Sequence, residues 1–493
     1  MNSRSASSDS NDRSRPAIVW FRDDLRVDDN PALNAAAQTG ASVFPVYVYD
    51  TVSPDIRESG AAQKWMLHYA LEELDASLKA IGLKLTILAG PAEDIICSLA
   101  DHCGAQAVFW NRRYGAAEIE IDMAVKRRLG EAGLRVKSFQ GNLLHEPTQL
   151  LTSKDDPYKV YSPFWRAFEK TGTPRQPRDS PSELVPFSTR LTSDLDRLEL
   201  SDLKLLPHTP DWAGGLRKTW AHGEKGAQRV LKEFLRDGLK GYAGGRDMPA
   251  DGHFSRLSPY LRHGMISPYR VWHAVGASNA PDRDKAKFLK ELGWREFSYH
   301  LLYHFPQIGW RNFDERFDVF PWEHKQSRLE AWQRGKTGYP IVDAGMRELW
   351  ETGYMHNRVR MVTASFLVKH LMIDWRDGET WFWDTLVDGD PANNPASWQW
   401  VAGCGADAAP YFRIFNPILQ GRKFDANGAY VRRWVPEIAD LPDKYLHAPW
   451  EADDETLAQA GISLGATYPK PMVDHSDARE RALEAFDGIK KAA

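Results

Sequence analysis

The sequence predicts two folded parts, an α/β domain with a parallel sheet followed by a larger all-α domain. Between residues 17 and 145, short apolar runs alternate with segments of helical spacing, whereas strand signals fade from about residue 226 onward. A second observation is the use of tryptophan, since thirteen of the nineteen tryptophans follow residue 270. A buried indole N–H requires a partner, so rings placed among carboxylates, amides and arginines indicate a use beyond packing.

Short runs rich in branched and aromatic residues predict strands at 17–21, 42–49, 83–88 and 107–111. Segments of helical spacing separate them, near 62–81 and 116–132. Strands that alternate with helices form βαβ units, which give a parallel, Rossmann-like sheet with ligands at the carboxyl ends of the strands. The first strand continues into WFRDDLRVDDNPAL rather than a GxGxxG turn, so an ordinary dinucleotide site is not expected there.

Composition along the chain places the domain boundaries. Residues 1–16 are polar and lack the apolar core of a secretory signal, so we expect a disordered tail. The α/β domain spans 17–145. Residues 146–225 are rich in proline and polar residues, which predicts a connector that wraps the surface between the domains. From 226 to 493 the spacing is helical, and this segment forms the all-α domain.

Bulk composition excludes several classes of protein. The 493 residues include 63 lysines and arginines and 67 acidic residues, a net charge of −4, so any contact with nucleic acid must come from a local basic surface. Cys97, Cys103 and Cys404 are too few for a disulfide framework or a four-cysteine cluster, and no metal site is expected. They fit a reducing compartment, and no apolar run is long enough to cross a membrane. We therefore expect a cytoplasmic protein.

One predicted helix, over 356–371, carries polar residues on a single face. Asn357, Arg360 and Met361 recur there at helical spacing. A helix face with an amide, a guanidinium and a thioether side by side is poorly suited to an apolar core. The face is therefore either a helix–helix contact or a surface that holds a polar heterocycle. A buried Arg360 requires an acidic partner, and Asp388 in the following DGD is the expected one.

Two further groups carry possible chemistry. Glu291 and Trp294 are three residues apart on a predicted helix, so that the carboxyl group could bind a base edge while the ring stacks on a base. The alternative is an ordinary amphipathic pair. Ser255 and Ser258 mark a helix start, where hydroxyls and backbone N–H groups bind phosphate or simply cap the helix.

Beyond these motifs, long segments resemble the cryptochrome/photolyase family, from Ile18 to about Val473. The matching segments are WFRDDLRVDDNPAL, GYPIVDAGMRELWETGYMHNRVRM, ASFLVKHLMIDWRDGE and FRIFNPILQGRKFD. The resemblance implies an N-terminal α/β domain that binds an antenna, and a C-terminal helical domain that binds FAD in a folded-back form and acts on DNA.

Within the family, the chain looks like a cyclobutane pyrimidine dimer photolyase. Asn357 and Met361 stand where six-four photolyases carry histidines. Asn394 matches an asparagine that faces flavin N5, where plant cryptochromes typically carry aspartate and animal ones cysteine. The amide of Asn394 is expected to rotate to serve different protonation states of N5. The stretch HAPWEADDETLAQAGISLGATYPKPMVD, with FWDTLVDGD, is similar to the bacterial class III photolyases.

The resemblance also implies roles for individual residues. The residues implied around FAD are Tyr242, Ser255, Ser258, Arg360, Asp388, Asp390 and Asn394. Those implied at the pyrimidine dimer and its phosphates are Arg246, Glu291, Trp294, Asn357, Arg358, Met361 and Trp400. Those expected to act in catalysis are Glu291, Asn394, Met361 and Asn357. In order and separation, an electron-transfer triad is matched by Trp398, Trp375 and Trp322, although packing alone could explain each ring.

The implied activity is that of a carbon–carbon lyase, the light-dependent splitting of pyrimidine dimers by an electron from excited reduced FAD. The alternatives are a cryptochrome-type signalling photoreceptor, a six-four photolyase and a non-photochemical flavoenzyme. Glu118 matches a carboxylate that contacts methenyltetrahydrofolate in some relatives, which predicts this pterin as the antenna. A deazaflavin and an empty antenna site are the alternatives. The expected partner is UV-damaged DNA, bound by a monomer at the bacterial nucleoid.

One residue departs from the family pattern. Phe254 stands where the family often has threonine, in the segment implied to bind the diphosphate. The two serines, backbone groups and other side chains would therefore have to hold the diphosphate.

Overall fold

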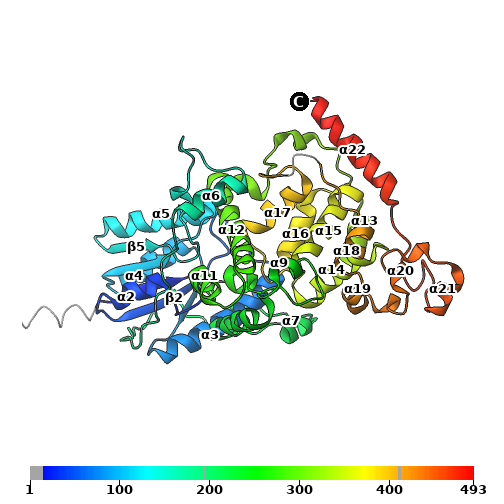
Figure 1. Cartoon of the computed structure of the whole chain (residues 1–493). Coiled ribbons are helices and arrows are strands. Elements are labelled where there is room, and N and C mark those ends of the chain that lie inside the picture. Colours follow the sequence, from blue (N-terminus) through cyan, green and yellow to red (C-terminus); the bar gives the residue numbers. More distant parts are fainter. Residues whose placement is uncertain (1–14, 192–194, 409–411, 493) are drawn as a thin grey trace, which may run out of the picture.

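The structure, a computed structural model, describes residues 15–191, 195–408 and 412–492 (Figure 1). In Figure 1 the sheet lies on one side of the molecule and the helical part on the other, with the C-terminal helix at the outer edge. Most of the expected N-terminal tail, residues 1–14, lies outside the described residues. Arg15 does belong to the fold, because its Nε donates to the carbonyl oxygen of Gly104 at 3.1 Å.

Five parallel strands form one sheet in the order β3-β2-β1-β4-β5. The strands are β1 (Ala17–Phe21), β2 (Val43–Tyr49), β3 (Thr86–Ala89), β4 (Ala107–Asn111) and β5 (Arg135–Phe139). The predicted α/β fold with a parallel sheet is therefore confirmed. The sequence analysis missed β5, because its residues RVKSF lie at the sheet edge, are mostly not buried and contain no apolar run.

Helices connect the strands in a doubly wound arrangement. They are α2 (Pro31–Ala37), α3 (Ala61–Ala80), α4 (Ala92–His102) and α5 (Ala116–Glu131). The helices predicted near 62–81 and 116–132 correspond to α3 and α5. The first of the four begins at Pro31 because the side chain of Asn30 accepts the N–H of Leu33 at 3.1 Å, and the proline fits the first helical turn.

The segment 146–225, predicted as a connector, contains several short helices. They are η1 (Pro147–Gln149), α6 (Tyr161–Lys170), η3 (Leu200–Leu203) and α7 (Gly214–Thr219). Buried aromatic residues on α6, among them Phe164 and Trp165, belong to the same core as the sheet. This segment therefore contributes packed structure as well as surface loops.

Buried residues up to Ile308 share the core of the sheet, whereas most of those from Phe317 onward form a second core rich in aromatic residues. The rest of the chain is helical, as predicted. Its first elements are α8 (Gly223–Glu233), η4 (Phe234–Gly238), α9 (Tyr242–Gly245), α10 (Ser258–Arg262), α11 (Pro268–Ala277), α12 (Asp282–His304), η5 (Pro306–Gly309), η6 (Glu315–Val319), α13 (Gln326–Gln333) and α14 (Pro340–Thr352). The later ones are α15 (Asn357–Ser365), η7 (Phe366–His370), α16 (Trp375–Thr385), α17 (Asn393–Ala402), α18 (Pro417–Phe424), α19 (Ala429–Trp434), η8 (Pro436–Ile438), α20 (Asp443–Leu446), η9 (Pro449–Glu451), α21 (Asp454–Gln459) and α22 (His475–Ala492). The helix predicted over 356–371 is divided into α15 and η7, a single π-helical turn.

The buried side chain of Arg26 joins the two parts of the molecule. Its guanidinium donates to the carbonyl oxygens of Gly141 at 2.8 Å and Gly264 at 2.9 Å. The backbones of Gly264 and Asp23 also approach each other closely, because a Cβ on Gly264 would lie 2.0 Å from the carbonyl oxygen of Asp23. The position of the helical part against the sheet therefore depends on backbone contacts at this junction.

In the described part of the chain, none of the helices combines the length and the apolar character needed to span a bilayer.

We predict that Gly264→Ala lowers the free energy of unfolding by ~2–5 kcal/mol, because φ of 65° adds left-handed strain to the clash with Asp23. Gly40→Ala is the matched control, since φ there is 71° and no atom lies within 4 Å of the added Cβ. The control should lose only ~1–2 kcal/mol, the cost of the left-handed backbone. Thermal and urea unfolding measure both, and equal losses would contradict a tight junction at Asp23.

Candidate functional site

A cavity of about 620 Å³ lies between α9, α10, α12, α15 and α17. This volume is typical of pockets for small molecules and cofactors. All the residues that the family resemblance assigns to FAD or to the pyrimidine dimer line this cavity, and Trp398 lines it too. The polar face predicted on one helix is part of its wall, because Asn357, Arg360 and Met361 all project from α15.

The predicted ion pair between Arg360 and Asp388 is present at one end of the cavity. Nη2 of Arg360 lies 2.8 Å from Oδ2 of Asp388, and the Ser258 hydroxyl donates to the same oxygen at 2.6 Å. Burial acts to lower the pKa of the Arg360 guanidinium, but the adjacent carboxylate outweighs it and the pKa is raised. Oδ1 of Asp388 is buried and has no hydrogen-bond partner among the described residues.

Ser258 differs in one respect from the sequence analysis. It is the first residue of α10, as predicted, but its hydroxyl neither caps the helix nor stays free for a phosphate, because it donates to Asp388. The hydroxyl of Ser255 accepts the N–H of Leu257 at 3.3 Å. Phe254, the departure from the family pattern, packs edge-on against His356 with ring centroids 5.3 Å apart.

The amide of Asn394 is held in one orientation. Its Nδ2 donates to Oε1 of Glu379 at 2.8 Å and to the carbonyl oxygen of the same residue at 3.0 Å. The buried Glu379 carboxylate is itself paired with both Nη atoms of Arg57, at 2.7 and 2.8 Å. Turning the amide would place Oδ1 against these two acceptors, so the contacts favour this orientation, and the expected rotation stays a prediction. Oδ1 is the amide atom available to a ligand.

Asp390 orients α17. Its Oδ1 accepts the backbone N–H groups of Ala392 at 2.8 Å and Asn393 at 2.7 Å, while Oδ2 accepts the hydroxyl of Tyr299 at 2.7 Å. A carboxylate at this position satisfies N–H groups that a helix start leaves without partners. Both oxygens are thus already bonded to protein, although the residue lines the cavity.

The charges at the other end of the cavity are linked to one another and partly exposed. The Glu291 carboxylate is paired with Arg246, and Lys287 lies one helical turn away with Nζ at 3.1 Å. Nη2 of Arg246 also donates to Oδ1 of Asn357 at 3.4 Å. Burial acts to lower the pKa of Arg246, but the charge of Glu291 raises it. Arg358 is paired with Asp247 at 2.9 Å.

Two tryptophans of the expected triad, Trp375 and Trp398, lie on the successive helices α16 and α17, and the third, Trp322, lies in the loop between η6 and α13. Trp398 lines the cavity, and a Cβ on Gly378 of α16 would lie 2.2 Å from its ring, so α16 and α17 meet closely. Trp375 begins α16, is fully buried, and its Nε1 donates to Oδ1 of Asn312 at 2.9 Å. Trp322 is half-buried beside Phe320, with ring centroids 4.4 Å apart.

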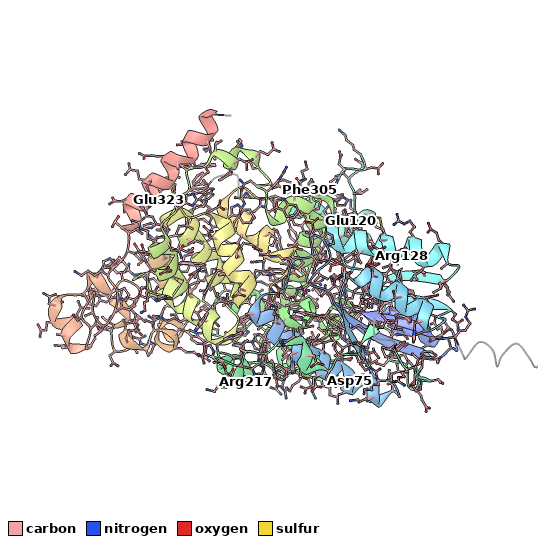
Figure 2. All side chains as sticks on the ribbon, turned by 180° about the vertical axis from the view of Figure 1, so that it is seen from behind. Asp75, Glu120, Arg128, Arg217, Phe305 and Glu323 are labelled. Carbon is pink, nitrogen blue, oxygen red and sulfur yellow. The ribbon has the colours of Figure 1, made fainter. Side chains whose placement is uncertain are left out.

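Trp322 lies close to the C-terminal helix. The next residue, Glu323, is seen beside α22 in Figure 2, and Nε of Arg481 is 3.9 Å from its carboxylate. The series therefore begins at the cavity wall and ends near the surface. Another tryptophan on α16, Trp381, stacks on Trp350 with centroids 5.9 Å apart and ring planes at 5°, and Trp350 is 61 % exposed.

Comparison with known proteins places these features in a family. The model described as "DNA photolyase" matches residues 17–182, and the model described as "FAD binding domain of DNA photolyase" matches residues 288–488. A deoxyribodipyrimidine photo-lyase of Agrobacterium fabrum is 52 % identical over 97 % of this chain and 99 % of its own length. The chain belongs to the DNA photolyase family.

The solved structures and other relatives agree with membership in the photolyase family. A bacterial class III photolyase from Agrobacterium tumefaciens superposes with a TM-score of 0.94 and 51 % identity, covering 99 % of this chain and 100 % of that one. Cryptochrome-2 of Arabidopsis thaliana is 35 % identical, over 97 % of this chain and 80 % of its own. The similarity to class III photolyases, expected from two segments of the sequence, therefore extends over almost the whole chain.

A second cavity, of about 710 Å³, occurs in this photolyase-family chain between the start of α3, residues 204–207 and α16. The aromatic residues that line it are Trp212, Trp381 and Trp383. Glu118, the expected antenna residue, lines neither cavity and is half-buried on the first turn of α5. Although burial acts to lower the pKa of the nearby Arg113, the charge of Glu118 raises it.

The sequence analysis missed residues that hold the site together. Glu379 and Arg57 fix Asn394 although they are 322 positions apart, and Lys287 adds a second cation at Glu291. Lys287 could have been found, because it lies one helical turn before Glu291, next to the predicted helix. Arg57 follows no motif and could not be paired from the sequence.

Proposed function

We propose that this protein is a light-driven DNA repair enzyme that splits cyclobutane pyrimidine dimers, with reduced FAD as its cofactor. One observation carries the proposal, namely that the residues assigned to flavin and those assigned to the dimer line the same cavity. Electron transfer between two bound groups requires that they lie close together, away from water. A common cavity meets this requirement without a large movement of the protein.

The hydrogen-bond acceptors and the positive charge in the cavity suit FAD. Oδ1 of Asp388 is a buried acceptor without a protein partner, which suits a ring N–H of the cofactor. Oδ1 of Asn394 offers a second acceptor, since Glu379 holds the amide nitrogen. The guanidinium of Arg360 beside Asp388 adds positive charge that favours an anionic ligand. When bound, excited reduced FAD supplies the electron that dimer splitting requires and that returns afterwards.

At the substrate end we assign Glu291 to the carbonyl edge of a thymine. In the structure its carboxylate is paired with Arg246 and Lys287, so substrate binding would exchange these partners for a base. Both cations would then be close to the DNA phosphates, and with Arg358 they would supply the salt-dependent share of binding. The pairing in the free protein therefore keeps the charge of Glu291 compensated until a dimer enters.

Stacking offsets part of the cost of base flipping. Flipping a nucleotide out of the duplex costs a few kcal/mol, and less at a damaged pair. Trp294 and Trp400 line the cavity from α12 and α17, and stacking on an aromatic ring contributes roughly 1–3 kcal/mol per base. Asn357 and Met361 complete this end of the cavity from α15. The same surface would favour a weakly stacked lesion over normal bases.

We further propose that Trp398, Trp375 and Trp322 reduce oxidised flavin in steps. Trp398 lines the cavity and Trp322 is half-buried, which supports placing the two ends of the proposed series at the cofactor and near the surface. The hydrogen bond from Trp375 to Asn312 supports transient positive charge on this ring, because Nδ2 of Asn312 is bonded to the Asp318 carboxylate at 2.6 Å.

For the antenna we propose methenyltetrahydrofolate at Glu118, with a deazaflavin or an empty site as the alternatives. The second cavity is the rival location, because indole rings on which a pterin can stack line it. We also propose that the protein acts as a monomer in the bacterial cytoplasm, bound to UV-damaged DNA. A signalling photoreceptor of cryptochrome type remains the second candidate function, favoured by the identity with plant cryptochromes.

The function is tested by blue-light repair of a defined thymine dimer in an oligonucleotide, with a six-four lesion as the second substrate. We expect turnover of the dimer only. Glu291→Ala should lower the repair yield about tenfold while flavin stays bound, the effect of one lost hydrogen bond worth ~1.4 kcal/mol. Glu120→Ala, at an exposed position on α5 (Figure 2), is the control and should repair normally. Turnover of neither lesion would favour the photoreceptor.

Trp375→Phe should slow the photoreduction of oxidised flavin at least about tenfold, because phenylalanine is far harder to oxidise than tryptophan. Repair by chemically pre-reduced protein should be unchanged, since it needs no electron from the series. Absorbance spectroscopy during illumination measures the photoreduction of the flavin and the repair of the dimer. Full photoreduction in this variant would contradict the assigned series. Trp381→Phe and Trp383→Phe would then identify another route.

Two variants locate the antenna. Glu118→Ala should abolish the absorbance of bound methenyltetrahydrofolate in protein reconstituted with it, while Trp212→Ala, in the second cavity, should retain it. Loss only in Trp212→Ala would move the antenna to that cavity and contradict the assignment of Glu118. Flavin absorbance serves as the internal control, because neither residue lines the cavity assigned to FAD.

A further inference from the structure

A second ring stacks on Trp294, which lines the cavity. The ring of Tyr161, the first residue of α6, lies against the indole of Trp294 with centroids 3.7 Å apart and planes at 10°. Its hydroxyl donates to the carbonyl oxygen of Lys290 at 2.6 Å, one turn before Trp294 on α12. Tyr161 thus covers one face of the indole, and the remaining ring surface lines the cavity.

The close approach of α6 to α12 depends on a glycine. A Cβ on Gly293 would lie 2.3 Å from Cζ3 of Trp165 and 2.9 Å from the Tyr161 hydroxyl. Glycine is the residue that allows such contact between a helix backbone and rings. The residue before Trp294 is therefore suited to bring Tyr161 onto the indole.

Asp407 contacts both Tyr161 and Trp400, the second indole that lines the cavity. Its Oδ2 accepts the backbone N–H of Tyr161 at 3.3 Å, and its carbonyl oxygen accepts the indole N–H of Trp400 at 3.0 Å. The backbone of Asp407 is left-handed, with φ of 53°. Among residues other than glycine, aspartate and asparagine tolerate this conformation best. Unfavourable backbone conformations of this kind are often found at functional sites.

We propose that Asp407 and Tyr161 are positioning residues that set the orientation of Trp294 and Trp400 toward each other. This inference rests on the proposed function, which assigns both indoles to stacking on the flipped bases. Asp407 itself would not touch the substrate. It holds one indole directly, through the N–H of Trp400, and the other through Tyr161, so that one left-handed residue fixes both sides of the gap into which a dimer would fit.

The side-chain carboxylate and the backbone carbonyl of Asp407 bond to different residues. The side-chain oxygen acts on Tyr161, whereas the carbonyl oxygen acts on Trp400 and depends on the left-handed backbone. Asparagine keeps an acceptor oxygen and tolerates the backbone, so Asp407→Asn should preserve both contacts. Alanine loses the acceptor and disfavours the backbone, so Asp407→Ala should loosen both walls.

The test compares Asp407→Ala with Asp407→Asn in the full-length, flavin-loaded protein. Binding and light-driven repair are measured on an oligonucleotide with one thymine dimer and on its undamaged copy. We expect the Kd and KM for the dimer to rise about tenfold in Asp407→Ala, with kcat at saturation changed less than about twofold. Affinity for undamaged DNA, flavin content and photoreduction should match the wild-type protein. Asp407→Asn should restore dimer binding to within about twofold.

A second pair of variants keeps the inference testable if Asp407→Ala does not fold. Tyr161→Leu removes the ring that supports Trp294, whereas Tyr161→Phe keeps the ring and loses only the hydroxyl. Dimer affinity should fall in the first and stay near the wild-type value in the second. Combined with Trp294→Ala, Tyr161→Leu should add little further loss, because both act through the same indole.

Several results would overturn the inference. One is an affinity for dimer DNA in Asp407→Ala and Tyr161→Leu that stays within about twofold of the wild-type value. Another is an equal fall in affinity for damaged and undamaged DNA. A third is a loss of dimer affinity in Asp407→Asn as large as the loss in Asp407→Ala. If wild-type protein repairs dimers while the variants do so equally well, only this inference fails. If wild-type protein neither binds nor repairs dimers, the proposed function fails and the inference with it.

Discussion

A carboxylate buried beside a cavity must be paired, and this requirement explains how the walls of the site are joined. Asp388 is held by Arg360 and Ser258, and Glu379 by Arg57, with each contact between 2.6 and 2.8 Å. Removing a partner from a fully buried ion pair leaves an uncompensated charge, which costs ~3–5 kcal/mol. Here water reaches the side chains of Arg57 and Arg360, so the cost is smaller. The pairs therefore connect segments far apart in sequence and fix the two acceptors left for a ligand, Oδ1 of Asp388 and Oδ1 of Asn394.

The two ends of the cavity differ in how firmly their charges are held. At the Asp388 end the carboxylate is almost fully buried, with a side-chain exposure of 4 %, which suits a cofactor that stays bound. At the Glu291 end the carboxylate is 25 % exposed and shared between Arg246 and Lys287. Partly exposed pairs contribute little to stability and can exchange partners at low cost. This end therefore suits a substrate that enters and leaves, and one cavity can serve both ligands.

The sequence predicted features that depend on local spacing. The shared face of Asn357, Arg360 and Met361 followed from helical periodicity, and Asp388, in the DGD that follows, was the expected partner of a buried Arg360. Family resemblance assigned roles to residues but gave no contacts between them. Arg57 with Glu379, and Tyr161 with Asp407, are pairs more than two hundred positions apart with no periodic signal, so only the folded chain brings them together. The edge strand β5 was missed because its exposed sequence lacks an apolar run.

The central claim is that one cavity holds reduced flavin and a pyrimidine dimer within electron-transfer distance. The most direct measurement is the fluorescence of reduced flavin in the protein, recorded during titration with an oligonucleotide that carries a thymine dimer and with its undamaged copy. The account predicts that dimer DNA quenches the emission as it binds and that the undamaged copy does not. Tight binding of dimer DNA with unchanged emission lifetime would contradict it, because the lesion would then be bound out of reach of the flavin.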